Sequence, residues 1–139
     1  MKRKEAILDR MNAANKKFRK ELSSGTVALL LLTVLDRAEK PMYGYQIGKL
    51  VGAGEEETPM VKQGAIYPVL RSLERSGLLT SRREASTSGP PRRYYEVTPL
   101  GHETVKEWQA IWRRTKRFVD DTLGGDYHGE EEGAGEGEQ

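Results

Sequence analysis

Residues 63–79 read QGAIYPVLRSLERSGLL, and residues 80–101 continue as TSRREASTSGPPRRYYEVTPLG. Four apolar side chains of the first stretch recur at the spacing of one helical face, namely Ile66, Val69, Leu70 and Leu73. This spacing predicts an amphipathic helix that ends at Gly77. The second stretch predicts a strand over 78–84, a turn-rich loop over 85–91 and a second strand over 93–97.

The polar residues of this region suit an anionic partner. The helical face opposite the apolar one carries Gln63, Tyr67, Arg71 and Glu74, and the predicted loop is flanked by Arg82, Arg83, Arg92 and Arg93. A helix followed by a hairpin with a basic tip is the outline of a winged helix-turn-helix. Its helix fits the major groove of DNA, and its arginines reach phosphates or the minor groove.

The DNA-binding candidates are Tyr43, Lys62, Gln63, Tyr67, Arg71, Arg82, Arg83, Arg92 and Arg93. Arg71 lies in the middle of the exposed helical face and is the best single candidate for a base or phosphate contact. Tyr67 either touches DNA or packs its ring on the hairpin. The hairpin arginines are expected to hold phosphates rather than to read bases.

Composition argues against most other classes of protein. The 139 residues suffice for one compact domain, and the absence of Cys removes disulfides and thiolate metal sites. With two His and no nucleophile–base pair or phosphate-binding glycine loop, we expect neither an enzyme nor a metal or cofactor site. No apolar run approaches the roughly 20 residues of a membrane span, and the charged N-terminus does not resemble a signal peptide. A cytoplasmic protein is therefore expected.

The small net charge of +2 hides a strongly uneven distribution. Residues 1–21 hold eight Lys/Arg against three Asp/Glu, and residues 60–117 hold twelve against five. Residues 118–139 hold none against eight. A basic body suits a polyanion, although charge alone is equally compatible with a solubilising role.

The N-terminal part predicts two helices. Residues 1–21 form a basic amphipathic extension in which Ile7, Leu8, Met11, Ala14 and Phe18 follow helical spacing. It either packs on the body or lays its basic face on DNA, and packing is favoured because Phe18 and Leu22 need cover. Ser23 or Ser24 is expected to cap a second helix over Thr26–Arg37, which is apolar almost all round and forms the spine of the core.

Residues 22–98 are expected to form the winged helix-turn-helix domain. Its middle helix covers Tyr43–Val51 and is followed by a loop over 52–60. Because a proline deep in a helix is costly, the helix that contains Pro68 is expected to start close to Ala65 or to kink.

A long C-terminal helix is predicted over residues 99–123, capped by Thr98 and with Pro99 at its first position. Its apolar seam predicts a dimer interface made by Val105, Trp108, Ile111, Trp112, Thr115, Phe118 and Val119. The indoles of Trp108 and Trp112 also offer flat surfaces for an aromatic ligand, or else they only fill the dimer core. Residues 124–139 are expected to be an acidic, disordered tail.

Three stretches together resemble the PadR family of transcriptional regulators, in its smaller subfamily with one C-terminal dimerisation helix. They are residues 43–47 (YGYQI), residues 64–79, and residues 92–101 (RRYYEVTPLG). The resemblance implies a homodimeric winged helix-turn-helix protein, mainly α with a small β-hairpin, usually a repressor and often released by a small hydrophobic or aromatic effector. Family members usually cap the third helix with Ser or Thr, where this chain has Lys62 or Gln63. They commonly begin near the first long helix, so the resemblance says little about residues 1–21.

The expected function is sequence-specific regulation of transcription on double-stranded DNA. A MarR-like regulator shares the architecture, and the basic N-terminal extension keeps that alternative open. A winged helix that binds protein and never DNA is a further alternative, because fold does not fix function.

Overall fold

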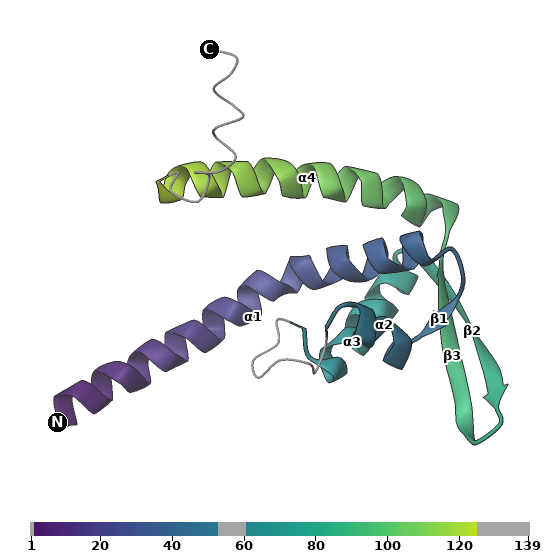
Figure 1. Ribbon diagram of the computed structural model, residues 1–139, viewed down its shortest axis with the longest axis horizontal. Helices are drawn as coiled ribbons and strands as arrows, with labels where there is room; N and C mark the ends of the chain where they lie inside the picture. Colours follow the sequence, from purple (N-terminus) through teal and green to yellow (C-terminus); the bar gives the residue numbers. More distant parts are fainter. Residues whose placement is uncertain (1, 53–60, 125–139) are drawn as a thin grey trace, which may run out of the picture. The chain divides into compact units, whose positions relative to one another are not determined.

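The structure is a computed structural model in which residues 2–52 and 61–124 are described. These residues form four helices and three strands (Figure 1). In chain order they are α1 (Lys2–Ala38), β1 (Met42–Tyr43), α2 (Gly44–Leu50), α3 (Gln63–Arg75), β2 (Leu79–Ser86), β3 (Gly89–Val97) and α4 (Pro99–Leu123). Most of the loop expected over 52–60 and of the tail expected over 124–139 lies outside the described residues.

The chain divides into two compact units, Met1–Val105 and Lys106–Gln139. The first contains the winged helix, and the second contains the greater part of α4. None of the described helices is long and apolar enough to cross a membrane. The fold is thus the mainly helical one with a small sheet that the sequence predicts.

The core of the first unit lies where the second half of α1 packs on α2, α3 and β3. Its innermost side chains are aliphatic: Leu31, Leu32, Leu35, Ile47, Ile66, Leu70, Leu79 and Val105. Burying one such side chain contributes about 1.5–3 kcal/mol relative to leaving it in water. The periodic residues Ile66, Leu70 and Leu73 of α3 all point into this core, as their spacing predicts.

The predicted break between two N-terminal helices is wrong, because α1 is one continuous helix of 37 residues. Ser23 does not cap a helix start: its hydroxyl donates to the carbonyl of Lys20 at 3.1 Å. Thr26 likewise donates to the carbonyl of Leu22 at 3.0 Å. Because the residues before them already form helical turns, the backbone N–H groups here bond within the helix and need no cap, and the two hydroxyls bond to carbonyls of the preceding turn.

The predicted packing of the N-terminal extension on the body is also wrong for the single chain. Residues 2–22 are exposed, and the side chain of Phe18 is 61% accessible to solvent. The first buried residue of α1 is Val27. The first half of α1 therefore extends beyond the winged helix.

The sheet is antiparallel, with the strand order β1-β3-β2. The short strand β1 is not expected from the sequence, which places Tyr43 at a helix start; instead Tyr43 pairs with Tyr94 of β3. The hairpin is longer than predicted, since β3 begins at Gly89 rather than Arg93. Tyr95 is buried and Tyr94 is partly exposed, which is the expected alternation across a strand.

Helix α3 begins at Gln63, two residues before the expected start at Ala65. Pro68 therefore lies in the second turn of the helix, where it has no N–H to donate. Lys62, the N-cap residue just before α3, has extended backbone angles, and its side chain makes no capping hydrogen bond.

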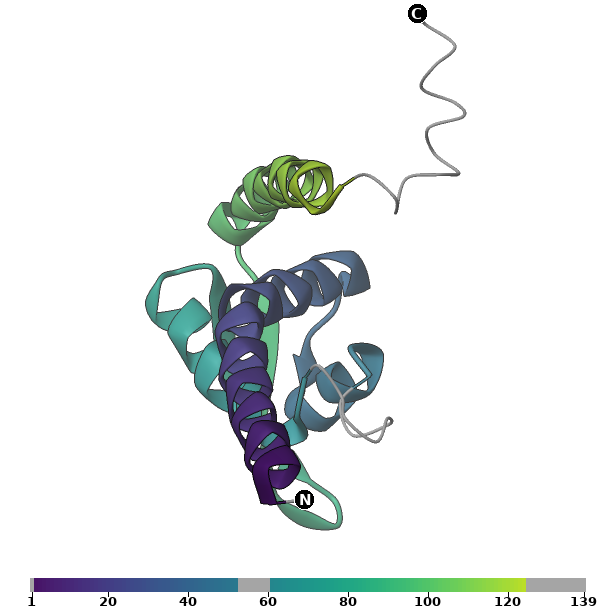
Figure 2. The same ribbon diagram turned by 90° about the vertical axis from the view of Figure 1, so that its left-hand side faces the viewer.

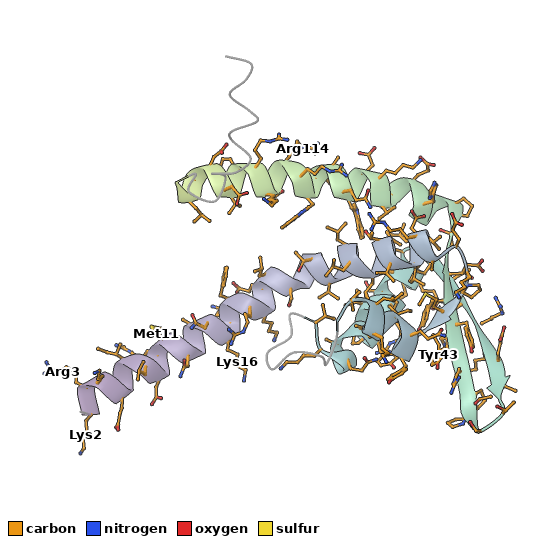
Figure 3. All side chains as sticks on the ribbon, viewed as in Figure 1. Lys2, Arg3, Met11, Lys16, Tyr43 and Arg114 are labelled. Carbon is orange, nitrogen blue, oxygen red and sulfur yellow. The ribbon has the colours of Figure 1, made fainter. Side chains whose placement is uncertain are left out.

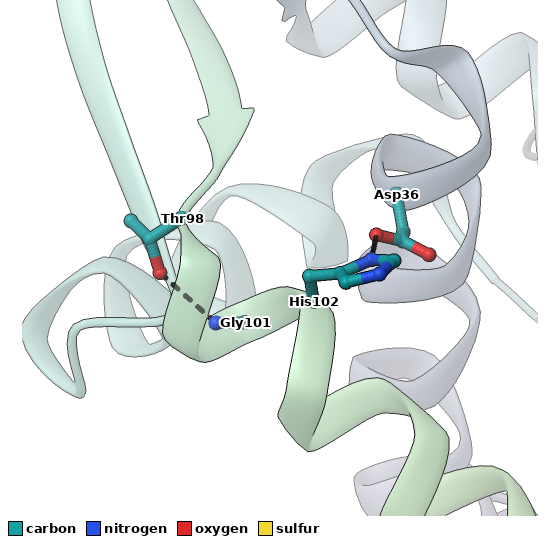
Figure 4. Close-up of polar contacts among 4 residues, drawn as sticks. All are labelled: Asp36, Thr98, Gly101 and His102. Carbon is teal, nitrogen blue, oxygen red and sulfur yellow. Dashed lines mark hydrogen bonds and ion pairs between the residues drawn. The ribbon is translucent and has the colours of Figure 1, made fainter.

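The junction between β3 and α4 confirms the predicted cap (Figure 4). The hydroxyl of Thr98 accepts a hydrogen bond from the Gly101 N–H at 3.0 Å and donates to the carbonyl of Gly77 at 2.7 Å. One residue later, Nδ1 of His102 lies 2.6 Å from a carboxylate oxygen of Asp36 in α1. These contacts fix the first turn of α4 to the winged helix.

Candidate nucleic-acid interface

One flank of α3 faces α2 rather than solvent. The side-chain amide of Gln63 donates to the carbonyl of Gly44 at 3.4 Å and is half-buried. A β-carbon added at Gly44 would collide with the ring of Tyr67, and one added at Gly48 would collide with the amide of Gln63. Two of the residues expected on the polar face thus hold α3 against α2, although Tyr67 keeps 38% of its surface exposed.

The outward face of α3 is rotated from the one expected. The residues that recur on it at helical spacing and are exposed are Gly64, Pro68, Arg71 and Arg75. Glu74, expected beside Arg71, is half-buried and turned toward β2, where its carboxylate accepts a bond from Ser81 at 2.8 Å. The expected face is occupied because α2 and β2 both pack on that flank of the helix.

Arg75 is the residue that the sequence reasoning missed on this face. It lies four residues after Arg71, so both guanidinium groups extend from the same side of α3. Helical spacing alone pairs these two arginines. It does not show that Gln63 and Tyr67 are partly used in packing.

The four hairpin arginines lie on two opposite faces of the sheet. In β2 and β3, Arg83 pairs with Arg93, whereas Arg82 pairs with Tyr94 and Glu84 pairs with Arg92. Since side chains alternate across a strand, Arg83 and Arg93 share the face of Ser81 and Tyr95, which is the face next to α3. Arg82 and Arg92 lie on the other face.

On the face next to α3, Arg93 belongs to a chain of hydrogen bonds that runs through Ser81 to Glu74. Its guanidinium donates to the hydroxyl of Ser81 at 3.0 Å, and that hydroxyl donates to Glu74 of α3 at 2.8 Å. Burial raises the pKa of the neighbouring Tyr95 above its usual value of 10, and the Glu74 carboxylate raises that pKa further. These hydrogen bonds fix the base of the hairpin to α3. Arg83 is exposed further along the same face.

On the other face, both arginines have partners within the chain. The Arg92 guanidinium lies over the ring of Tyr43, 4.4 Å from its centroid, and Tyr43 meets Tyr94 edge-on at 5.4 Å. Arg82 forms an exposed ion pair with Glu84 at 2.7 Å, which partly offsets its charge. Tyr43 thus supports Arg92 at the edge of the hairpin.

The structure therefore brings together some of the candidates and separates others. Arg71 and Arg75 are exposed on the outward face of α3, and Arg83 is exposed on the hairpin face next to α3. Lys62 is exposed at the start of α3. Among residues 2–52 and 61–124 there is no group of three or more metal-binding side chains.

The second unit presents an apolar stripe along α4. Its exposed large side chains are Ile111, Trp112, Phe118, Val119 and Leu123. Trp108 is half-buried. Val105, also expected at the dimer interface, is 1% exposed and is therefore already covered within its own chain.

Comparison with known proteins agrees with this architecture. Residues 31–107, more than half of the chain, match the Transcriptional regulator PadR-like family. The chain belongs to that family. The PadR match also decides against the MarR-like alternative. As a member of this family, the protein is a transcriptional regulator rather than an enzyme.

Solved structures of PadR regulators resemble the chain over most of its length. A PadR family transcriptional regulator from Eggerthella lenta is 29% identical, with a TM-score of 0.64, and the match covers 86% of this chain and 97% of that one. A PadR-like regulator from Bacillus cereus is 25% identical, with a TM-score of 0.60, and the match covers 76% and 99%. A transcriptional regulator of Mycobacterium tuberculosis is 37% identical over 68 residues, which are 49% of this chain and 60% of that protein.

Proposed function

We propose that this PadR-like regulator binds duplex DNA in a sequence-specific way, with α3 in the major groove and the hairpin against the adjoining backbone. The observation that carries the proposal is the outward face of α3, where Arg71 and Arg75 are exposed while the opposite face is buried in the core. Arginine reads guanine through two hydrogen bonds in the major groove. Arg83 adds positive charge on the hairpin face next to α3, where it can hold a phosphate.

Binding is tested with duplexes that the purified protein selects from a random pool. Arg71→Ala should cost about 1–3 kcal/mol on the selected site and relax the preference at one base position. Arg37→Ala, which removes an exposed arginine at the end of α1, is the matched control and should change affinity much less. A wild-type protein without affinity for any duplex at low salt would instead favour a protein-binding winged helix.

We further propose that the protein acts as a homodimer held together by α4. The stripe on α4 is exposed over five large apolar residues, and monomers rarely leave such a patch uncovered. A two-fold dimer places two recognition helices on successive major grooves, about 34 Å apart. The preferred site would then be nearly palindromic.

Repression released by a flat aromatic effector is the regulatory role we propose. Trp108 and Trp112 lie one helical turn apart on α4, and Trp112 is 41% exposed. A two-fold axis near them brings four indoles together, which attract flat or cationic ligands.

Titration with a panel of planar dyes, followed by tryptophan fluorescence, tests this role. Saturable quenching that Trp112→Leu abolishes, and that accompanies release of DNA, is the expected result. If no member of the panel quenches saturably, the indoles only fill the dimer core.

A further inference from the structure

The first half of α1 is a charged helix that the winged helix does not use for its own packing. Residues 2–20 contain eight Lys/Arg and two Asp/Glu, and every one of these side chains is exposed. Four of the basic residues cluster around Phe18, namely Lys16, Lys17, Arg19 and Lys20. So dense a positive cluster within one part of a helix suits a polyanion.

Because α1 is continuous, helical spacing shows which lysines of its first half lie on the same side as the buried residues of its second half. Lys20 and Lys16 precede the buried Val27 by seven and eleven residues, which are two and three helical turns. Lys2 precedes Val27 by seven turns in the same way. All three lysines therefore extend from the side of α1 that packs on the winged helix. Two acidic residues, Glu5 and Asp9, lie on the same side near Lys2, so the positive charge of this side is concentrated at Lys16 and Lys20.

Figure 1 shows how the first half of α1 is placed relative to α3 and the hairpin within the first unit. The N-terminal end of α1 and the tip of the hairpin β2–β3 both lie at the lower edge, with α3 between them, and Figure 2 shows the same lower edge from the side. Figure 3 shows Lys2 and Lys16 extending toward that edge. The side of α1 that carries Lys2 and Lys16 thus faces the same way as the hairpin tip.

The apolar residues of the extension lie on a different side of the helix. Met11 follows Lys2 by nine residues, which is two and a half turns, and so lies opposite it. Ile7 and Phe18 share the side of Met11, four residues before it and seven after it. Contact between the lysine side and a partner would therefore leave the apolar side free for other packing.

We propose that the first half of α1 is a second DNA-binding element, which holds phosphates flanking the site read by α3. The proposal rests on the proposed DNA binding of α3. A helix of 20 residues is about 30 Å long, comparable to roughly nine base pairs of duplex. Lysines at three positions along it can contact the backbone without reading sequence, so the element extends the footprint and raises affinity for every flanking sequence alike.

The experiment compares two duplexes bound by the full-length protein. Both contain the selected site, one with almost no flanking DNA and one with about ten extra base pairs on each side. Wild-type protein should bind the longer duplex about ten-fold more tightly at low salt. Lys16→Gln with Lys20→Gln should abolish that advantage and lower the slope of log affinity against log salt by about 1.8 on the longer duplex only.

The matched control removes two positive charges from other sides of the same helix. In Figure 3 Arg3 extends away from the lower edge, and Lys4 lies seven residues before Met11 on the apolar side. Arg3→Gln with Lys4→Gln should retain most of the flanking advantage. All four residues are exposed, so circular dichroism should show unchanged helix content in both variants.

The outcomes separate the two proposals. Wild-type protein that binds neither duplex would overturn DNA binding by α3 itself. Equal wild-type affinity for the two duplexes would overturn the α1 element while leaving α3 in place. Equal losses in the two double variants would also overturn it, since only overall charge would then matter.

Discussion

Gly44 and Gly48 let two helices lie closer than any larger residue would allow. A β-carbon at Gly44 would overlap the ring of Tyr67, whereas one at Gly25 in α1 meets nothing within 4 Å. A methyl group is therefore accommodated at Gly25 but not at Gly44, although both glycines are helical. Close packing fixes the angle at which α3 presents Arg71.

Alanine substitution at these glycines should shift stability in opposite directions. Gly44→Ala should destabilise the fold by about 1–3 kcal/mol, because the Tyr67 ring of α3 must turn away from α2. Gly25→Ala should stabilise it by roughly 0.5–1 kcal/mol, because alanine is the better residue within a continuous helix. Urea unfolding followed by circular dichroism measures both. A destabilising Gly25→Ala would contradict the continuity of α1.

At the scale of the element, the hairpin presents neighbouring arginines to opposite sides. Arg83 lies on the face next to α3, and Arg82 lies on the other face in an ion pair with Glu84. An exposed pair of this kind contributes little to stability. Both residues can therefore be changed without unfolding the sheet.

Arg83→Ala should weaken DNA binding more than Arg82→Ala. Arg83 is directed to the side where α3 is proposed to bind DNA, so its loss should remove a phosphate contact and lower the salt slope by about 0.9. Arg82 should leave the slope nearly unchanged. Fluorescence anisotropy over a series of salt concentrations measures this, and a larger loss for Arg82→Ala would place the DNA on the opposite face of the hairpin.

At the scale of the whole molecule, two helices leave apolar residues exposed. The first half of α1 exposes Ile7 and Phe18, and α4 exposes Trp112, Phe118 and Val119. Apolar side chains gathered along one side of a helix suit contact with another protein surface, here the second copy of the proposed dimer. Association of two copies is the simplest way to cover these side chains.

Trp112→Asp combined with Val119→Asp should give monomers, because two carboxylates would be buried without partners in the α4 interface. Affinity for a palindromic site should fall by orders of magnitude, since each monomer holds only one half-site. Analytical ultracentrifugation measures the mass. A double variant that still sediments as a dimer would place the main contact elsewhere, with the stripe of α1 as the next candidate.

The sequence by itself determined the elements whose signals are local. Apolar spacing predicted α3 and α4, Thr98 predicted the start of α4, and a combination of short motifs identified the family. Capping is only partly local, since Ser23 can serve either as a helix cap or as a residue within a helix. The choice depends on whether the preceding residues already form helical turns, and here they do.

Tertiary structure decided which faces are free. Gln63 and Tyr67 have the spacing of an exposed face, but α2 packs on that flank because Gly44 and Gly48 lack side chains. With that flank covered, the outward face of α3 is the one that carries Arg71 and Arg75. The division of the hairpin arginines depends on the register of β2 and β3, which is set by long-range pairing and not by the arginines themselves. Burial and register arise between distant segments, so only the folded chain defines them.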